Sequence, residues 1–244
     1  MSTAPAADQR MLLDLQQLDT NLAKLAHQRA AHPTLETLRE LSGRAEDLDR
    51  SRAQTQVVVS DTRREVTKAE TDVEQVRNRA DRDRQRLETG QGTSKDLMAL
   101  QHELESLGKR QSDLEDVELE VMERLEEAEG TLNAITEQLS AVRADITRVE
   151  GERDAAFAEL DDQISRVQTQ RDALAAGIDT ALLALYEKVR TQTGGLGAVA
   201  LRGGATQGIQ VPLSLSEKAA IEAAGDDEVL RSEDYGYILV RLEK

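Results

Sequence analysis

The sequence predicts a mainly α-helical fold, in which a long antiparallel coiled-coil hairpin precedes a small β-rich C-terminal module. Three observations predict it. Apolar residues recur with a seven-residue period over most of the chain, a short Gly-containing segment interrupts that period, and Gly and β-forming residues become frequent after residue 192. We therefore expect two domains: a hairpin over 1–191, with its tip near 89–93, and a module over 192–244.

Composition limits the functions that the chain can have. It has 244 residues, a formal net charge of −16, no Cys and only 2% aromatic residues. Without Cys, disulfides and thiolate metal sites are excluded. The negative charge repels phosphate backbones and anionic lipid, so nucleic-acid binding would need a local basic patch. With no signal-peptide pattern and no apolar run that could cross a bilayer, we expect a cytoplasmic protein without membrane contact.

The heptad pattern defines the two arms of the hairpin. In the first arm, one apolar seam runs from Leu38 to Leu87 and a second from Leu41 to Asp83, both without a skip. The pattern resumes in the second arm from Leu97 onward. Between the arms lie Gly90 and Gly92, followed by Thr93 and Ser94, either of which could cap the next helix. Helices joined by so short a loop are expected to be antiparallel neighbours.

An apex at Gly90 predicts the register, because facing residues should then have numbers that add up to about 180. Three complementary ion pairs are expected on one flank: Arg86 with Asp96, Arg79 with Glu103, and Asp72 with Arg110. On the other flank Arg63 should meet Glu115, whereas Asp49 should meet Glu129 unfavourably. Such exposed pairs contribute little stability and mainly specify the register.

Residues 8–30 are expected to extend the first arm. Their apolar positions Met11, Leu15, Leu18 and Leu22 would face Val167, Ile164, Leu160 and Phe157 in that order. Pro33 in the first arm and Gly151 in the second predict a kink or a stutter of the heptads at that level.

The C-terminal module is expected to contain short strands at 199–201, 208–211 and 237–241. Ser214 and Glu217 have the spacing of a capping box, and Gly225 would end the short helix that they begin. A module of this size is marginal for independent folding.

Three segments carry a family resemblance. Ser94 to Leu107 at the tip, Ala184 to Arg190 before the module, and Gly236 to Val240 near the end are similar to bacterial zinc-ribbon proteins that have a long N-terminal helical hairpin. The resemblance covers nearly the whole chain and implies a zinc-ribbon-like module, but all four zinc-ligand Cys are missing. The positions of the former ligands hold Thr206, Ile209, Ser232 and Tyr235.

These four residue types cannot supply a tetrahedral zinc site, so we expect no metal. Ile209 and Tyr235 could fill the vacated site with apolar contacts. The alternative is a loosened, partly disordered tail.

No catalytic or cofactor motif stands out. Gly195 to Ala200 matches G-x-G-x-x-A, but it follows a helix instead of a strand and lies outside any βαβ unit. His27, His32 and His102 are too dispersed to suggest a metal site, and acidic residues are spread over the solvated faces. We expect neither an enzyme nor a cofactor.

The tip carries the one concentration of basic residues. Arg79 and Arg86 are assigned to interhelical pairs, while Arg77, Arg82 and Arg84, together with Lys95, are left without an assigned partner. Either the whole cluster serves the coiled coil, or these four residues bind an acidic partner. Two functions follow: a non-catalytic adaptor that binds a macromolecular partner, expected to be a protein, through the tip and the C-terminal module, or a nucleic-acid-associated, transcription-related regulator that uses the Arg cluster. The sequence leaves the oligomeric state open.

Overall fold

The computed structural model describes residues 3–90, 92–203, 205–208 and 213–242. Within these residues the elements in chain order are α1 (Ala6–Ala30), α2 (Pro33–Glu88), α3 (Ser94–Ala175), α4 (Thr180–Gln192), β1 (Ala198–Arg202), β2 (Ala205–Thr206), α5 (Leu215–Ala223), β3 (Leu230–Arg231) and β4 (Ile238–Arg241). The expected mainly helical fold, with a long helical hairpin and a small C-terminal sheet, is confirmed.

The chain forms two compact units. One unit contains residues 36–150, and the other contains residues 1–35 together with 151–244. The boundaries of these units differ from the two domains expected from the sequence, 1–191 and 192–244. That division into domains stays a prediction. Each unit is described below by itself.

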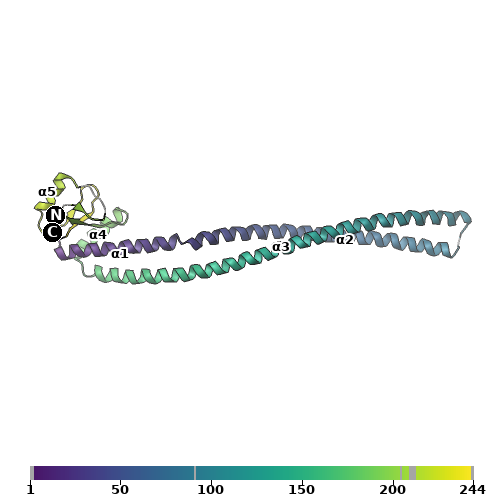
Figure 1. Ribbon diagram of the computed structural model, residues 1–244, viewed down its shortest axis with the longest axis horizontal. Coiled ribbons are helices and arrows are strands. Elements are labelled where there is room, and N and C mark those ends of the chain that lie inside the picture. The colour runs from purple at the N-terminus through teal and green to yellow at the C-terminus, as the bar shows by residue number, and fades with distance from the viewer. Residues whose placement is uncertain (1–2, 91, 204, 209–212, 243–244) are drawn as a thin grey trace. The chain divides into compact units, whose positions relative to one another are not determined.

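In the unit of residues 36–150, α2 and α3 lie side by side and are joined by a short turn (Figure 1). Gly90 and Gly92 have φ values of 61° and 142°, a conformation that a β-carbon disfavours. Thr93 caps α3, because its hydroxyl accepts the backbone N–H of Asp96 at 3.3 Å and its own N–H donates to the Asp96 carboxylate at 2.9 Å. The Thr93 hydroxyl also donates to the Asp96 carboxylate at 2.7 Å. This hydrogen bond first, and the one from the Thr93 backbone second, lower the pKa of Asp96.

The heptad seams form the core of this unit. The buried residues of α2 are Val59, Thr62, Val66, Ala69, Val73 and Ala80, and those of this part of α3 include Leu107, Val121, Leu139, Val142 and Val149. Small and β-branched side chains predominate, which explains why the facing helices need no aromatic residues.

The register of the ion pairs corrects the expectation for one flank. Arg63 pairs with Glu129 at 2.5 Å instead of Glu115, and Glu115 pairs with Arg77 at 2.5 Å. Asp49 pairs favourably with Arg143 at 2.6 Å. The residue numbers of all three pairs add up to 192, not 178. The midpoint between α2 and α3 falls one residue beyond Gly90, which raises the expected sum of residue numbers. In addition, side chains in both helices lean toward the N-terminus of their own helix. Two side chains that touch across the hairpin therefore have residue numbers with a higher sum than two residues whose backbones lie at the same height.

On the other flank Arg79 Nη2 lies 2.6 Å from Glu103, as the sequence pattern suggested, but two expected pairs differ. Arg86 lies 3.9 Å from Asp83 in its own helix, because Asp96 serves the Thr93 cap. Among the described residues Asp72 and Arg110 form no ion pair with each other and instead line one groove.

In the other unit, the predicted break at Pro33 is present. Helix α1 ends at Ala30, and α2 begins at Pro33, which suits the first helical position because its missing N–H would have no partner there. Gly151 does not interrupt α3. Phe157 lies beneath the Arg29 guanidinium and against His32, with 4.4 Å from the guanidinium carbon to the ring centre. Phe157 was expected to face Leu22. Its contacts with Arg29 and His32 again give residue numbers with a higher sum than expected, as in the ion pairs of the other unit.

The second arm is not one helix up to residue 191. Residues 176–179 separate α3 from α4. Asp179 caps α4 by accepting the backbone N–H groups of Ala181 and Leu182, both at 3.0 Å. Gly is typical of turns and Asp of helix N-caps, so Gly177 and Asp179 were a local signal for this break. The heptad pattern predicted instead that the arm continues to residue 191.

The C-terminal sheet has the strand order β2-β1-β4-β3 in the described residues. β1 and β4 are parallel, with Val199 opposite Leu239, and the two outer pairings are antiparallel. The strands expected at 199–201 and 237–241 correspond to β1 and β4. Gly208 lies in a bend, and the rest of the strand expected at 208–211 lies outside the described residues. Strands β2 and β3 were not expected.

Both faces of the sheet are covered. Alternation along β1 and β4 turns Ala198, Ile238 and Val240 toward a core shared with α1 and α4. Val199, Leu201 and Leu239 face a second core with Ile221 of α5. The predicted Ser214–Glu217 capping box at the start of α5 is present, and α5 ends two residues before Gly225.

Candidate functional site

A buried polar network joins α1, α3 and α4. Asp19, whose side chain is 3% exposed, accepts the Tyr186 hydroxyl at 2.8 Å and Arg171 Nε at 3.0 Å, and Arg190 Nε lies 3.5 Å from it. Glu187 bonds to both arginines. The two carboxylates therefore balance the two guanidinium groups, as buried charges require.

The environment of this network shifts its pKa values. Burial, together with the hydrogen bond to Asp19, raises the pKa of the fully buried Tyr186. Burial alone would lower the pKa of Arg171, but the hydrogen bonds to Asp19 and Glu187 raise it. Tyr186 and Arg171 therefore each stay in one protonation state near neutral pH, which suits a structural role.

Gln16 connects this network to the start of the sheet. Its side-chain oxygen accepts the backbone N–H groups of Gly197 at 2.6 Å and Ala198 at 3.3 Å, and its amide donates to the Gly195 carbonyl at 2.9 Å. The Tyr186 hydroxyl also lies 3.3 Å from the Gln16 oxygen. The backbone of the G-x-G-x-x-A segment is thus hydrogen-bonded to Gln16. Gly195 has a positive φ of 121°, and Gly197 packs against the Tyr186 ring.

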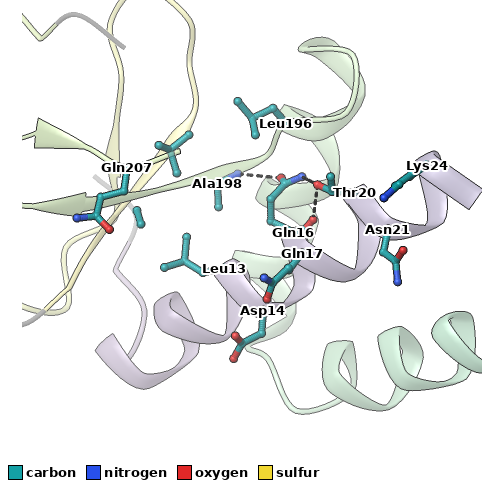
Figure 2. Close-up of a pocket in the computed structure, with 12 residues that line it drawn as sticks. Leu13, Asp14, Gln16, Gln17, Thr20, Asn21, Lys24, Leu196, Ala198 and Gln207 are labelled. Atoms are coloured by element: carbon teal, nitrogen blue, oxygen red, sulfur yellow. Dashed lines mark hydrogen bonds between the residues drawn. The ribbon is translucent and has the colours of Figure 1, made fainter. Parts of the chain in front are cut away.

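A cleft lies beside this hydrogen-bonded wall, between α1 and β1 (Figure 2). We call it the α1 cleft. Leu13, Leu196 and Ala198 to Ala200 provide its apolar surface, and polar side chains at its edge come mainly from exposed positions of α1. These polar residues are Asp14, Gln17, Thr20, Asn21, Lys24 and Gln207. The cleft has a volume of about 500 Å³, within the range of ligand pockets.

The zinc-ribbon resemblance assigns lost ligands to four positions, and those that the structure describes form no packed apolar plug. Tyr235 is 51% exposed and stacks on Tyr237, so the expectation that it fills the vacated site is wrong. Ser232 is the buried residue instead, at 3% exposure, and its hydroxyl has no hydrogen-bond partner among the described residues. Thr206 lies in β2, and Ile209 lies outside the described residues.

At the tip, two of the four candidate binding residues have acidic neighbours. Arg77 pairs with Glu115, and Arg84 pairs with Asp81 at 2.9 Å, which corrects the assumption that they are free. Arg82 donates from Nε to the carbonyl of Asn78. In the described part of the chain, Arg82 and Lys95 form no ion pair with a carboxylate.

The other sequence candidates do not come together. His27 lies in α1, His102 lies in α3, and His32 lies between α1 and α2, where it bonds to Thr34. In the described ranges no group of three or more His, Cys, Asp or Glu side chains is arranged to hold a metal ion. None of the helices that are described has both the length and the apolar character needed to cross a bilayer.

Sequence reasoning missed the roles of Gln16 and Asp19. Both follow the buried Leu12 and Leu15 at helical spacing, on the inner face of α1. Two polar residues on an apolar helix face are the signal that could have found them.

Comparisons with known proteins agree with this architecture. An uncharacterized protein of Mycobacterium tuberculosis is 38% identical over 240 residues, covering 98% of each chain. A solved structure from Mycobacterium smegmatis is 35% identical, with a TM-score of 0.86, and covers 98% of this chain and all of that one. The structure of CT398 from Chlamydia trachomatis is 16% identical with a TM-score of 0.71, covers 97% of this chain and 98% of that one, and supports the fold alone.

The family model described as the CT398-like coiled coil hairpin domain matches residues 15–194. This range includes the α2–α3 hairpin, the Asp19 network and α4. The chain therefore belongs to the CT398-like coiled-coil hairpin family.

Proposed function

We propose that this protein is a non-catalytic adaptor that binds a protein partner through the hairpin tip and through the α1 cleft, which α1 forms with the C-terminal module. The observation that carries the proposal is the α1 cleft, which lies against a wall fixed by the Gln16 hydrogen bonds. A fixed wall lowers the entropy cost of binding, because the receptor needs little ordering when the partner arrives.

The lining of the cleft favours binding over chemistry. Its ionisable side chains among the described residues are Asp14 and Lys24, and neither lies in a nucleophile–base arrangement. The remaining lining consists of amides, one Thr and apolar groups, which suit contacts to a peptide.

The tip is the second proposed surface. Arg82 and Lys95 keep their charges free of carboxylate partners in the described residues, whereas Arg77 and Arg84 are compensated locally. We therefore keep Arg82 and Lys95 as binding residues and assign Arg77 and Arg84 to the stability of the hairpin.

The alternative is a nucleic-acid-associated, transcription-related regulator. The charge of −16 and the carboxylates beside Arg77, Arg79, Arg84 and Arg86 oppose it, because phosphate binding requires uncompensated cations. Retention of RNA or DNA that falls steeply with added salt would favour this regulator over the adaptor.

We also propose that the C-terminal module derives from a zinc ribbon and does without the metal. The buried Ser232, at a former ligand position, and the two apolar cores on the faces of the sheet support this view. In such a module, apolar packing replaces the stabilisation that zinc supplies in small ribbons.

Photo-crosslinking in cells tests the adaptor function. A photoreactive residue is introduced into the full chain at Asn21 in the cleft, at Arg82 near the tip, or at the exposed positions Glu120 and Glu127 as controls. We expect Asn21 and Arg82 to crosslink to protein, and the two controls not to. Crosslinks from the controls alone, or from no position, would contradict the adaptor.

A further inference from the structure

A second hollow lies between α2 and α3 within the unit of residues 36–150. We call it the tip groove. It has a volume of about 1060 Å³ and a mostly polar lining. The apolar part of the lining consists of the half-buried Val76 and Leu114 and the edge of the core residue Leu107. Leu107 and Leu114 are one heptad apart on α3, so the apolar surface follows the helix axis.

Basic side chains line both sides of this groove. Arg79 and Arg82 belong to α2, and Arg110 belongs to α3. Arg79 is paired with Glu103, but in the described residues neither Arg82 nor Arg110 lies within ion-pair distance of a carboxylate. Arg82 and Arg110 therefore place two uncompensated guanidinium groups on opposite helices of one groove.

Two carboxylates also line the groove. Asp81 is paired with Arg84, which neutralises it. Asp72 has no cationic partner among the described residues and marks one end of the lining in sequence. Among the described residues that line the groove, the two unpaired basic residues, Arg82 and Arg110, therefore outnumber the one unpaired acidic residue, Asp72.

We infer that the tip groove binds one amphipathic helix of a partner protein, whose apolar stripe is flanked by Asp or Glu residues. This inference rests on the proposed adaptor function and specifies the class of its tip-bound partner. The apolar stripe covers Val76, Leu107 and Leu114, and its acidic flanks meet Arg82 on one side and Arg110 on the other. The mode is that of a third helix added to a helix pair.

Two features favour a helix over nucleic acid. No aromatic side chain is found among the described residues that line the groove, and these residues offer no surface on which bases could stack. The carboxylate of Asp72 would repel a phosphate backbone, whereas a folded helix can place an uncharged residue beside it. The heptad spacing of the two leucines matches the repeat of an amphipathic helix.

Fluorescence anisotropy with synthetic peptides tests the inference on the full chain. The probe is a dilute, labelled three-heptad helical peptide with a Leu stripe flanked by Glu, and its matched peptide carries Lys at every Glu position. We expect the acidic peptide to bind roughly tenfold or more tightly than the basic one, with an affinity that falls as salt is added.

The variant Arg82→Glu/Arg110→Glu removes and reverses the free charges. It should weaken binding of the acidic peptide about tenfold or more, because attraction becomes repulsion. The matched control is Arg44→Glu/Lys68→Glu, which makes the same charge change on exposed positions of α2 outside the groove and should leave binding nearly unchanged. Helix content by circular dichroism checks that both variants fold.

Equal binding of the two peptides, binding of neither, or an equal loss in both variants would overturn the inference. Displacement of the acidic peptide by a mixed-sequence single-stranded oligonucleotide, with the same Arg82 and Arg110 dependence, would assign the groove to nucleic acid instead. If the peptides fail to bind as expected but a photoreactive residue at position 82 still crosslinks to protein in cells, the groove inference is wrong and the adaptor function is retained. The two proposals can therefore fail separately.

Discussion

The ring of Tyr186 lies directly against the backbone of Gly197. A β-carbon built on Gly197 would lie 2.4 Å from Cε2 of the ring, a distance that real side chains do not show. Tyr186 is fully buried and hydrogen-bonded to Asp19, so it cannot swing away at low cost. Packing around this pair connects α4 to the start of β1.

Gly197→Ala should therefore destabilise the C-terminal module by roughly 1–3 kcal/mol, the usual cost of overpacking a well-packed core. The chain has no Trp, and all three Tyr residues, at 186, 235 and 237, belong to the unit of residues 1–35 and 151–244 that contains this module. Tyr fluorescence in urea therefore reports on the unfolding of that unit. Gly225→Ala is the control, because no atom lies within 4 Å of its added β-carbon. Equal midpoints for the two variants would contradict the steric argument.

Removing the Tyr186 hydroxyl and removing the Asp19 carboxylate should lower the free energy of unfolding by different amounts. Tyr186→Phe deletes one hydrogen bond and should cost about 1 kcal/mol. Asp19→Ala leaves two partly buried guanidinium groups with Glu187 alone, and should cost about 3 kcal/mol. The double variant should cost less than the sum, because both changes remove the same 2.8 Å hydrogen bond. Strict additivity in urea unfolding would show that the two groups do not interact.

Several parts of the fold could be predicted from the sequence because the signals were local or periodic. The heptads predicted the hairpin, Gly90 and Gly92 its turn, Pro33 its break, and Ser214 with Glu217 the capping box. Each of these depends on residues that are neighbours in sequence or on one helix face.

The remainder depends on contacts between distant segments. A shift of two heptads keeps Arg63 on the same flank, so periodicity could not choose between Glu115 and Glu129. The partners of Gln16 are about 180 positions away, and no local pattern links them. The α1 cleft and the tip groove follow from such contacts, whereas the basic character of the tip was visible in sequence.

The ladder of ion pairs with numbers adding up to 192 predicts an engineered pair. Glu70 and Met122 have the same sum and lie between Arg63–Glu129 and Arg77–Glu115. In the described residues Glu70 has no cationic partner, and Met122 is 46% exposed. Met122→Lys should raise the melting temperature slightly at low salt, through an exposed pair worth a few tenths of a kcal/mol, and the gain should vanish at high salt. Met122→Gln is the neutral control, and an equal gain from it would exclude an ionic cause.

Ser232 offers a stabilising substitution. Its hydroxyl is buried and has no hydrogen-bond partner in the described part of the chain, a state that costs desolvation energy with no hydrogen bond in return. Ser232→Ala should therefore stabilise the C-terminal module by about 1 kcal/mol in urea unfolding followed by Tyr fluorescence. Ser214→Ala, which removes a hydroxyl that caps α5, should instead destabilise by about 1 kcal/mol. A loss of stability in both variants would mean that the Ser232 hydroxyl has a partner after all.

Glu217 predicts how the C-terminal module responds to acid. Its carboxylate is 6% exposed and accepts the backbone N–H groups of Glu233 at 2.9 Å and Ser214 at 2.8 Å. These hydrogen bonds favour the charged form and lower the pKa of Glu217 below its ordinary value of 4.5. The unfolded chain therefore binds a proton more readily than the folded one, so the contribution to stability is present above about pH 4.5 and is lost as the pH falls through the lower folded-state pKa.

Urea unfolding followed by Tyr fluorescence should show a falling midpoint as the pH is lowered below about 4.5. Glu217→Gln should start from a lower midpoint at neutral pH, because its amide nitrogen cannot accept a backbone N–H, and should lose part of the acid dependence. Glu222→Gln is the matched control, since Glu222 is exposed on the same helix α5 and should leave the pH profile unchanged. If Glu217→Gln kept the full pH profile of the native chain, the acid sensitivity of the module would have to come from other carboxylates.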